Sequence, residues 1–504
     1  MPDGSGSATR PAVPEIDLVG QLAAFVTSPA PRVLLIRGAP GSGRSTLVRA
    51  VVQRLPGPIL YVAYRAGVGT GASLEITLTI LDPTRTPEGA AGAERSPPTV
   101  PLSFAPTGST PSETFPPPLK EAIDRLVASG GGWVVADTWD RAAEEAFRAI
   151  ASPAATVSRM TSPMTILRES LGRLPLPSIV VIGEDPDPQV DAISDGVVVL
   201  RSEPIGDAQV RVLSIAAMRG AAKPDTHFLY SLGGGKFYTP TAHRPGFVGP
   251  AGPAEPEPNV ESGTVWPGSA AYAAAFGRLR HHALTLLELD RSTSFDLADV
   301  LLVPMVVSVV RAGGRVVWVP PGLASPAKVG ASLARFLPEE AISQGVRVLS
   351  GSPHDSAGQL RTIGIGPGRG RDPGAPDTHS EDPSAPAFPA AYQFLRDRRG
   401  DGPALFLLSV EGLNSLAKVA GTTYDPATFP LVISTYARLR GFHGVGYGGG
   451  ESPLVKEMVP AVDVHVRIHQ RYGRALLVGV RPPTPAYLLD WTDSSGRYSL
   501  VPLE

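Results

Sequence analysis

The sequence has no cysteine among its 504 residues. Disulfide bonds, thiol catalysis and cysteine-ligated zinc are therefore excluded. Charged residues are sparse at 18%, and the formal net charge is −2, so the composition favours neither a nucleic-acid surface nor a surface for acidic membranes. The longest apolar run, Val300–Val310, contains Pro304 and is too short to cross a bilayer. No apolar signal core follows Met1, and we expect a cytoplasmic protein.

Glycine and proline are abundant instead, with 55 and 54 residues, and hydrophobic residues make up 42%. A chain of this length and apolar content can bury more than one core, so we expect two or three domains joined by long connecting segments. Composition predicts a disordered leader at 1–14, a first domain at 15–238 with an insertion at 66–118, a proline- and glycine-rich linker at 239–268, and a second domain at 269–504 with a low-complexity insertion at 364–389.

The chain is organised around Val33–Leu47. The apolar start of this stretch predicts a buried strand of a parallel sheet, and its end predicts a helix. Between them, Gly38-x-x-x-x-Gly43-Arg44-Ser45 matches the P-loop pattern apart from Arg44, where lysine is usual. Glycines let backbone N–H groups converge on a phosphate, and the helix N-terminus adds positive partial charge. A glycine-rich strand-to-helix turn of any α/β domain is the alternative. The candidate phosphate-binding residues are Gly38, Ala39, Pro40, Gly41, Ser42, Gly43, Arg44, Ser45 and Thr46.

A further candidate ligand ends the apolar strand predicted at Gly130–Asp137. The hydroxyl of Ser45 or Thr46 would suit a Mg²⁺ ion beside a phosphate. That Asp137 would hold this ion through water is what the family resemblance described below implies. Capping of the following helix by Asp137 is the alternative. Ser45 and Asp137 are therefore the candidate metal residues, and Asp137 also joins the candidate nucleotide-binding set.

Strands and helices alternate through the first domain and give way to hairpins near its end, which predicts a mainly parallel sheet flanked by helices with antiparallel terminal strands. The second domain is expected to repeat this order after a long helix at Ala271–Leu289. Its histidines do not favour a zinc site. His281 and His282 are expected on the surface of that helix, and His465 and His469 on one face of a strand.

Taken in order, these motifs resemble the RecA-superfamily ATPases of the circadian-clock KaiC and archaeal RadA-like type, and they are similar to the archaeal gas-vesicle regulatory D-type proteins. The resemblance rests on the P-loop at Gly38–Thr46, the Walker B strand ending at Asp137, Ala217-Met-Arg219-Gly220 in the place of Lys-x-Arg-Gly, and the hairpin Phe228–Phe237. It implies an α/β fold of tandem RecA-like P-loop domains, ATP and Mg²⁺ as cofactors, and a homo-oligomer or a regulatory protein as partner.

The resemblance also implies two catalytic roles. Glu184 would sense the γ-phosphate or orient the attacking water, and Arg219 would reach the nucleotide of a neighbouring subunit as an arginine finger. A solvated loop carboxylate and an ordinary surface arginine are the alternatives for these two residues.

Two departures from the family pattern argue for slow or absent hydrolysis. The guanidinium of Arg44 is bulky and planar, so it cannot act as the compact point charge that lysine provides. The glutamate that usually polarises water just beyond the second strand is missing, and the next carboxylate, Glu75, lies on an alternating segment and is a weak substitute. Loss of a positioned base typically lowers the rate about 10²–10⁴-fold.

The second domain is further from the pattern. We place its P-loop equivalent at Pro320–Gly330, which lacks the Gly-Lys-Ser/Thr ending, and Ser409 stands where the Walker B aspartate is needed. We therefore expect a structural domain that binds no nucleotide. The leading hypothesis is an ATP-binding regulatory or assembly protein with weak or no hydrolysis. An active ring-forming ATPase of motor or clock type and a pure scaffold with relic P-loops are the alternatives, and a DNA-acting recombinase fits the charge less well.

Overall fold

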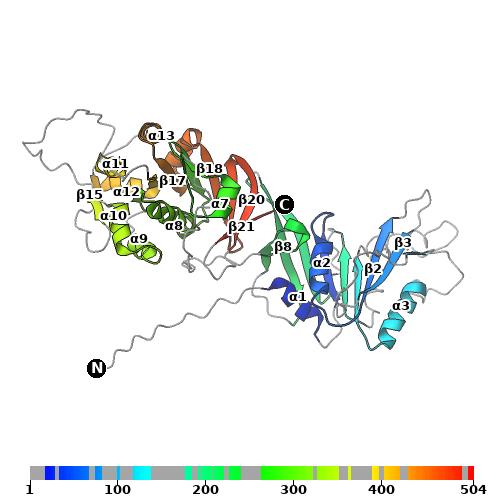
Figure 1. The fold of residues 1–504 in the computed structure, drawn as a ribbon. Helices are drawn as coiled ribbons and strands as arrows, with labels where there is room; N and C mark the ends of the chain where they lie inside the picture. Colours follow the sequence, from blue (N-terminus) through cyan, green and yellow to red (C-terminus); the bar gives the residue numbers. More distant parts are fainter. Residues whose placement is uncertain are drawn as a thin grey trace, which may run out of the picture. The chain divides into compact units, whose positions relative to one another are not determined.

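The structure, a computed structural model, describes residues 17–28, 33–66, 74–81, 99–102, 117–137, 176–183, 191–192, 194–206, 208–220, 226–239, 263–321, 326–350, 361–364, 389–396, 402–420, 429–490 and 498–503. The expected leader, Glu184, and most of the two insertions and the linker lie outside these residues. The chain divides into two compact units, Met1–Thr239 and Pro240–Glu504. Each unit is built around its own sheet (Figure 1).

The first unit contains a nine-stranded sheet in the order β4-β3-β2-β5-β6-β1-β7-β8-β9. Strands β2, β5, β6, β1 and β7 are parallel to one another, and the strands at both margins pair antiparallel. The elements of this unit are α1 (Leu18–Val26), β1 (Val33–Gly38), α2 (Arg44–Val52), β2 (Ile59–Ala66), β3 (Leu74–Leu81), β4 (Thr99–Leu102), α3 (Pro117–Ala128), β5 (Trp133–Asp137), β6 (Ser178–Ile182), β7 (Gly196–Ile205), β8 (Ala208–Met218), β9 (His227–Leu229) and the 3₁₀ turn η1 (Gly233–Gly235).

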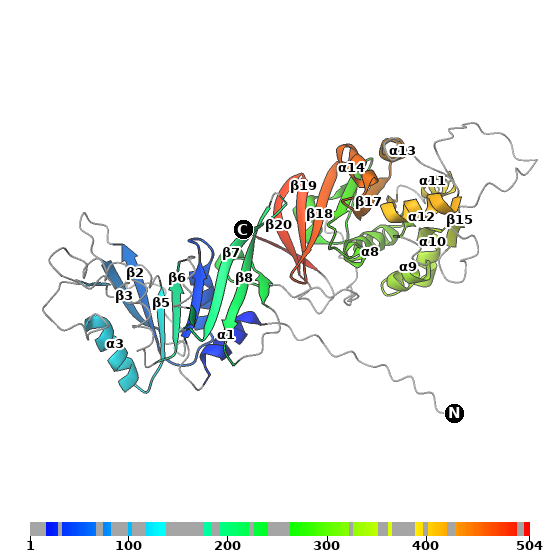
Figure 2. The same cartoon turned by 180° about the vertical axis from the view of Figure 1, so that it is seen from behind.

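Helices α1 and α2 pack against one face of this sheet (Figure 1), and Figure 2 shows the unit from behind. α2 buries Leu47, Val48 and Val51, which recur at helical spacing, in the same core as Leu34 and Ile36 of β1. Leu34 and Ile36 are two positions apart in a strand, so both side chains point to the α2 face. This packing holds the N-terminus of α2 at the carboxyl end of β1.

The second unit contains a ten-stranded sheet in the order β15-β14-β13-β16-β17-β12-β18-β19-β20-β21 and a separate pair, β10-β11. Strands from β15 to β18 are parallel, and β19, β20 and β21 follow as antiparallel neighbours. The strands are β10 (Thr264–Val265), β11 (Leu279–Arg280), β12 (Leu284–Leu289), β13 (Arg315–Val319), β14 (Val346–Ser350), β15 (Arg361–Gly364), β16 (Ala404–Ser409), β17 (His443–Gly449), β18 (Val464–Arg471), β19 (Arg474–Arg481), β20 (Pro483–Asp490) and β21 (Ser499–Pro502). The helices are α7 (Ala270–Phe276), α8 (Phe295–Arg311), α9 (Pro326–Leu333), α10 (Glu339–Gly345), α11 (Pro389–Arg396), α12 (Val410–Ala420), α13 (Phe429–Arg440), α14 (Pro453–Met458) and the 3₁₀ turn η2 (Val459–Ala461).

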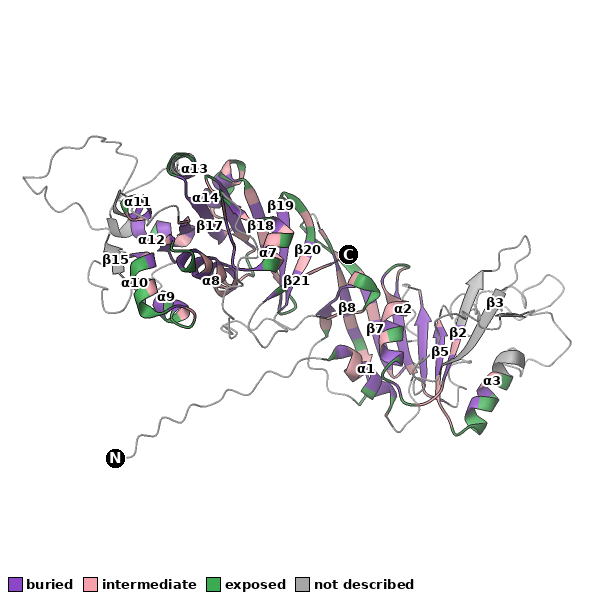
Figure 3. Cartoon of the chain, viewed as in Figure 1, coloured by how far each residue is buried: buried purple, intermediate pink, exposed green. Residues whose placement is uncertain are grey.

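The second sheet has a hydrophobic core on each face, and its central strands are buried along most of their length (Figure 3). Leu287 and Leu289 of β12 belong to the core that contains α8, whereas Leu286 belongs to the core on the other face. The sequence of a strand that is buried on both faces is a continuous run of apolar residues and does not alternate between apolar and polar residues. This burial explains why periodicity alone does not reveal β12.

The long helix predicted at Ala271–Leu289 is wrong. The helix in this region, α7, ends at Phe276, and Gly277 follows with a φ of 87°, which ends the helical path. The residues after it form β11 and β12. His281 and His282 therefore lie in the turn between two strands, where His282 has a φ of 63° and its Nδ1 lies 2.5 Å from the carbonyl oxygen of Arg438.

The parallel strands of the two sheets follow one order. In the first sheet the spatial order of the parallel strands is β7-β1-β6-β5-β2, and in the second sheet it is β18-β12-β17-β16-β13. In both sheets, the strand that comes first in the chain (β1 or β12) lies between the strand that comes last (β7 or β18) and the one before it (β6 or β17). Strand β12 therefore has the position of β1, and β16 has the position of β5. Among the described residues, no helix is both long enough and apolar enough to span a membrane.

A buried histidine joins three strands of the second unit. His443, at the start of β17, is fully buried, with Nδ1 2.6 Å from the carbonyl oxygen of Arg280 and Nε2 3.0 Å from Thr285 Oγ1. The neutral ring satisfies both contacts when Nδ1–H donates to the carbonyl and Nε2 accepts from the hydroxyl. Burial lowers the pKa of His443 from 6.5 to about 4, although the bond to Arg280 opposes this effect.

The second unit is expected to lose stability as the pH falls from about 6.5 to about 4, because the unfolded chain then binds a proton that folded His443 does not. The full effect of this one group is about 3 kcal/mol. Urea denaturation at a series of pH values measures it. In His443→Asn, whose side chain can still donate to the Arg280 carbonyl, the decline over this interval should be shallower. An unchanged decline would mean that other groups cause it.

Candidate functional site

The turn between β1 and α2 covers residues 39–43 and lies at the carboxyl end of a central strand of the first sheet. Gly41 and Gly43 adopt φ angles of 80° and 89°, in the left-handed region. Gly38 has no room for a side chain, because a Cβ atom there would lie 2.5 Å from Ser42 Oγ and 2.7 Å from the carbonyl oxygen of Leu200. The backbone geometry or the lack of space at these positions therefore requires glycine at Gly38, Gly41 and Gly43.

Two carbonyl groups of this turn point toward the antiparallel margin of the sheet. Arg211 Nη1 on β8 donates a hydrogen bond to the carbonyl oxygen of Gly41 at 2.8 Å, and the hydroxyl of Tyr230 donates one to that of Ser42 at 2.5 Å. Burial raises the pKa of Tyr230 to about 12, against the opposing charge of Arg211, so this hydroxyl keeps its proton. The C=O and N–H bonds of a trans peptide point in opposite directions, so the N–H of Gly43 points away from Tyr230.

Among the described residues, no side chain caps the N-terminus of α2. The N-cap residue is Gly43, and the N–H of Leu47 donates to the Gly43 carbonyl at 2.9 Å. The amides of Arg44, Ser45 and Thr46 come before this hydrogen bond, at the positive end of a nine-residue helix. The turn and the helix together form an arrangement that suits an anion.

The two candidate metal residues lie next to each other. Ser45 Oγ donates a hydrogen bond to Asp137 Oδ2 at 3.1 Å, and the hydroxyl of Tyr61 donates to the same oxygen at 2.8 Å. The three residues come from α2, β5 and β2, so the strand order brings them together. Within the described part of the chain, no group of three or more His, Cys, Asp or Glu side chains could hold a metal ion. A divalent cation at Asp137 would therefore need further oxygen ligands from a phosphate and from water.

Arg44 makes a contact within the protein. Its Nη1 donates a hydrogen bond to the carbonyl oxygen of Ile182 at 2.5 Å. Ile182 is the last residue of β6, which lies between β1 and β5. The bond ties the first turn of α2 to the neighbouring strand, and a guanidinium has other N–H groups that can meet a phosphate. Arg44 therefore positions the helix, a role that a lysine would fill less rigidly.

Arg219 lies at the other edge of the sheet. Strand β8 runs antiparallel to β7, so the residue after β8 lies beside Asp195, at the amino end of the parallel strands. Arg219 Nη2 donates to the carbonyl oxygen of Ala192 at 2.6 Å, and Nη1 lies 3.8 Å from Asp195 Oδ1. The structure therefore does not bring Arg219 to the turn of its own unit, and its role toward a neighbouring subunit stays a prediction.

The structure says less about Glu184 and Glu75, the two other carboxylates that the sequence analysis considered. Glu184 lies outside the described residues, one position after Gly183 at the end of β6. The backbone of Glu75 pairs with Arg65 in the antiparallel ladder of β2 and β3, near the carboxyl end of β2. The end of β2 itself, Ala63-Tyr64-Arg65-Ala66, carries no carboxylate.

The second unit has a corresponding turn between β12 and α8. It covers residues 290–294 and is equal in length to residues 39–43, and β12 takes the place of β1 in its sheet. The start of each strand is also bound in the same way. The N–H of Val33 donates to Asp195 Oδ2 at 3.1 Å, and the N–H of Leu284 donates to Asp463 Oδ2 at 2.9 Å. The positions of the two turns can therefore be matched one to one.

This match corrects one sequence assignment and agrees with another. The segment Pro320–Gly330 follows β13, which has the position of β2, so it is not the P-loop equivalent. The assignment fails because no glycine pattern marks the true equivalent, Asp290–Ser294. The pairing of β5 with β6 and of β16 with β17 places Ser409 at the position of Asp137, as expected from the sequence.

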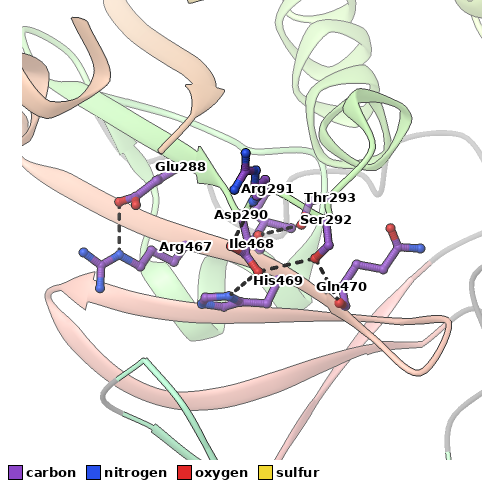
Figure 4. A network of polar contacts seen from close by, with 9 residues as sticks. All are labelled: Glu288, Asp290, Arg291, Ser292, Thr293, Arg467, Ile468, His469 and Gln470. Atoms are coloured by element: carbon purple, nitrogen blue, oxygen red, sulfur yellow. Dashed lines mark hydrogen bonds and ion pairs between the residues drawn. The ribbon is translucent and has the colours of Figure 1, made fainter. Parts of the chain in front are cut away.

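The turn of the second unit satisfies its helix with its own side chains. Ser294 is the N-cap of α8, and its Oγ accepts a hydrogen bond from the N–H of Asp296 at 3.3 Å. Asp290 Oδ1 accepts one from the N–H of Arg291 at 2.8 Å, and its Oδ2 lies 3.5 Å from His469 Nδ1 (Figure 4). The carboxylates of Asp290 and Asp296 stand where the first unit has Ala39 and Ser45, so an anion would meet two negative charges here.

Charged pairs continue this network along β12 and β18. Glu288 Oε2 lies 2.7 Å from His465 Nε2 and 3.0 Å from Arg467 Nε (Figure 4 shows the second contact). The hydrogen bond from His465 lowers the pKa of Glu288 against the opposing effect of burial, and Arg467 lowers it further. His465, Arg467 and His469 lie on one face of β18, as expected for the two histidines, and they contact acidic residues.

Three residues of the first site are missed by sequence reasoning, namely Tyr61, Arg211 and Tyr230. Arg211 and Tyr230 are separated from the turn by 170 and 188 positions in the chain, and nothing in their local sequence marks them. Tyr61 has a faint signal, since it lies on the predicted second strand, which pairs with the strand that ends at Asp137.

The sheets and helices define a mixed α/β protein. A candidate site for an anion and a divalent cation lies at the carboxyl edge of its first sheet, formed by the glycine turn, the N-terminus of α2 and the pair of Ser45 and Asp137. Neither the comparison with protein-family models nor the comparison with curated proteins finds a match for this chain.

Gly43→Ala is expected to destabilise the first unit more than Gly41→Ala. Both residues have a positive φ, which costs an alanine about 1 kcal/mol. At Gly43 the added Cβ would also lie 2.7 Å from Leu232 Cδ1 and Cδ2, whereas nothing lies within 4 Å at Gly41. The methyl groups of Leu232 can shift, so we expect a loss for Gly43→Ala of about 1–2 kcal/mol, somewhat above that for Gly41→Ala. Urea denaturation of the full chain compares the two variants, and equal losses would contradict the packing of Leu232 on the turn.

Proposed function

We propose that the first unit binds ATP with Mg²⁺, in the manner of a RecA-like P-loop domain, and that the protein acts in regulation or assembly with weak or no hydrolysis. The single observation that carries the proposal is the uncapped N-terminus of α2 behind a turn whose carbonyls are held outward by Arg211 and Tyr230. The N–H of Ser42 donates to the carbonyl oxygen of Ala39 at 3.1 Å, so the phosphate would be met by the N–H of Gly43 and the first amides of α2.

The pair Ser45 and Asp137 supports a magnesium ion in this site. Mg²⁺ usually keeps several waters and is held by one or two protein oxygens together with phosphate oxygens. The hydroxyl and the carboxylate, 3.1 Å apart, offer that small number of protein ligands beside the anion site. The Mg²⁺ ion of bound MgATP would supply the positive charge that compensates the carboxylate.

Weak hydrolysis is supported by what surrounds the turn. Arg44 is bound to the carbonyl oxygen of Ile182, so its charge is held at the end of β6. The end of β2 carries no carboxylate to polarise water. Without a positioned base, bound ATP would persist and act as a signal or as a structural ligand.

The second unit is proposed to bind no nucleotide and to serve as a partner domain within the chain. Its equivalent turn is capped by Ser294 and lined by Asp290 and Asp296, and Ser409 replaces the carboxylate. The matching strand order supports a tandem arrangement of two RecA-like units, of which only the first keeps the groups needed for a phosphate.

A fluorescent ATP analogue should bind the full chain in the presence of Mg²⁺. Ser45→Ala and Asp137→Asn should each weaken this binding about 10- to 100-fold, because each removes a hydrogen-bonding or ligand group beside a charge. Titration by fluorescence anisotropy measures the dissociation constants. Ser409→Ala, at the position in the second unit that matches Asp137, is the control and should leave them unchanged. Absence of binding to the unaltered chain would rule the proposal out in favour of a pure scaffold.

Arg44→Lys is expected to raise phosphate release from ATP by about tenfold or more, because a lysine ammonium can follow the transferring phosphoryl group while the guanidinium stays at Ile182. Steady-state phosphate assays with and without the substitution measure it. Arg44→Gln, which removes the charge, should show no increase. Rapid release by the unaltered chain would instead favour the active ATPase.

A further inference from the structure

A cavity of about 370 Å³ opens in the second unit, away from the ion-pair network of β12 and β18. Its walls come from the first turns of α8, the end of β13, helix α9 and the first turn of α12. A cavity of this size lies within the range of small-molecule sites. It has no part in the proposed nucleotide site, which belongs to the first unit.

The walls are mainly apolar and include two aromatic rings, Phe295 and Trp318. Trp318 is held in place, since its Nε1–H donates to the hydroxyl of Tyr447 at 2.9 Å and that hydroxyl donates to the carbonyl oxygen of Val319 at 3.2 Å. An aromatic ring fixed in this way offers a rigid surface to a flat ligand, and its face attracts a positive charge.

The charged residues of the cavity do not balance. Three carboxylates line it, those of Asp296, Asp299 and Glu411, with one ammonium group, that of Lys328. Lys328 Nζ lies 3.5 Å from Asp296 Oδ1, and this one cation faces three carboxylates. Glu411 is fixed by hydrogen bonds from Ser409 Oγ and from the N–H of Gly449, both at 3.1 Å. The lining therefore carries a negative surplus in a partly apolar space.

Asp299 is the least satisfied of these groups. Among the described residues, its buried Oδ1 has no hydrogen-bond partner. Burial raises the pKa of Asp299 to about 6, against the opposing charge of Lys328. A buried carboxylate oxygen without a donor is costly, and an N–H-bearing cation at this place would remove the cost.

Other ligand classes fit less well. In the described part of the chain, no group of three or more potential ligands could hold a metal ion. An anion would meet three carboxylates at a helix N-terminus that Ser294 already caps. A neutral apolar ligand would leave Asp299 without a donor.

We propose that this cavity binds a small organic cation, an amidinium or a guanidinium on a flat apolar body. The N–H groups pair with Asp299, and the body lies against Trp318 and Phe295. The second unit would then carry a ligand site of its own, opposite in charge preference to the site of the first unit. This inference does not rest on nucleotide binding.

The test uses the full chain and two probes of nearly equal shape, benzamidine, which is cationic, and benzamide, which is neutral. Isothermal titration calorimetry should show benzamidine binding at least about tenfold more tightly than benzamide, since only the cation forms charge-assisted hydrogen bonds with a carboxylate. Failure to bind benzamidine, or equal binding of the two probes, would overturn the proposal.

Asp299→Asn keeps the shape and removes the charge, so it should abolish the preference for benzamidine. Glu457→Gln makes the same change of charge at an exposed position of α14, outside the cavity lining, and should keep the preference. Ser332→Phe fills the cavity from α9 without altering a carboxylate and should abolish binding of both probes, which tests the location even where Asp299→Asn fails to fold. Preference retained in folded Asp299→Asn, or binding retained in Ser332→Phe, would place the cation elsewhere.

Discussion

The first amides of the helix that follows the earliest parallel strand have to find partners, and the two units of this chain meet that constraint in opposite ways. In the second unit, Ser294 caps α8 and Asp296 contributes a negative charge in the first turn. In the first unit, Gly43 offers no side chain to α2, and Arg211 and Tyr230 hold the carbonyls of the turn outward. A side chain of the protein therefore caps α8, whereas none among the described residues caps α2.

Much of the first unit could be read from the sequence because its signals are local. The apolar run before Gly38, the glycines of the turn and the strand that ends at Asp137 predict β1, α2 and β5 closely. The contact between Ser45 and Asp137 depends on the strand order, which brings the carboxyl ends of β1 and β5 to one edge, and the sequence implies it only through the family resemblance. Arg211 and Tyr230 could not be found in this way, because their role depends on antiparallel strands that return to the turn from far along the chain.

In the second unit, the absence of the P-loop glycine pattern also makes the preceding strand, β12, hard to predict from the sequence. Without glycines after Leu289, nothing in the sequence marks a strand-to-helix turn, and a strand buried on both faces has no alternation. The apolar residues from Ala271 onward then resemble one long helix. The sequence pattern therefore places the P-loop equivalent one strand too late in the chain, at the turn after β13, where proline and glycine are present. Strand order, which the sequence does not display, restores the match between β12 and β1.

Matched positions also explain how two units with one strand order can differ in what they bind. Arg37 of β1 pairs with Asp191 at 3.2 Å, whereas the matching Glu288 of β12 pairs with His465 and Arg467. Asp290 and Asp296 likewise add carboxylates where the first unit has Ala39 and Ser45. Each of these exchanges adds a negative charge at the carboxyl edge of the second sheet, although Ser409 in the place of Asp137 removes one, and the cavity beside Asp299 is also lined by carboxylates. Substitutions at the ends of a few strands therefore change the charge at the carboxyl edge of the sheet while the strand order stays the same.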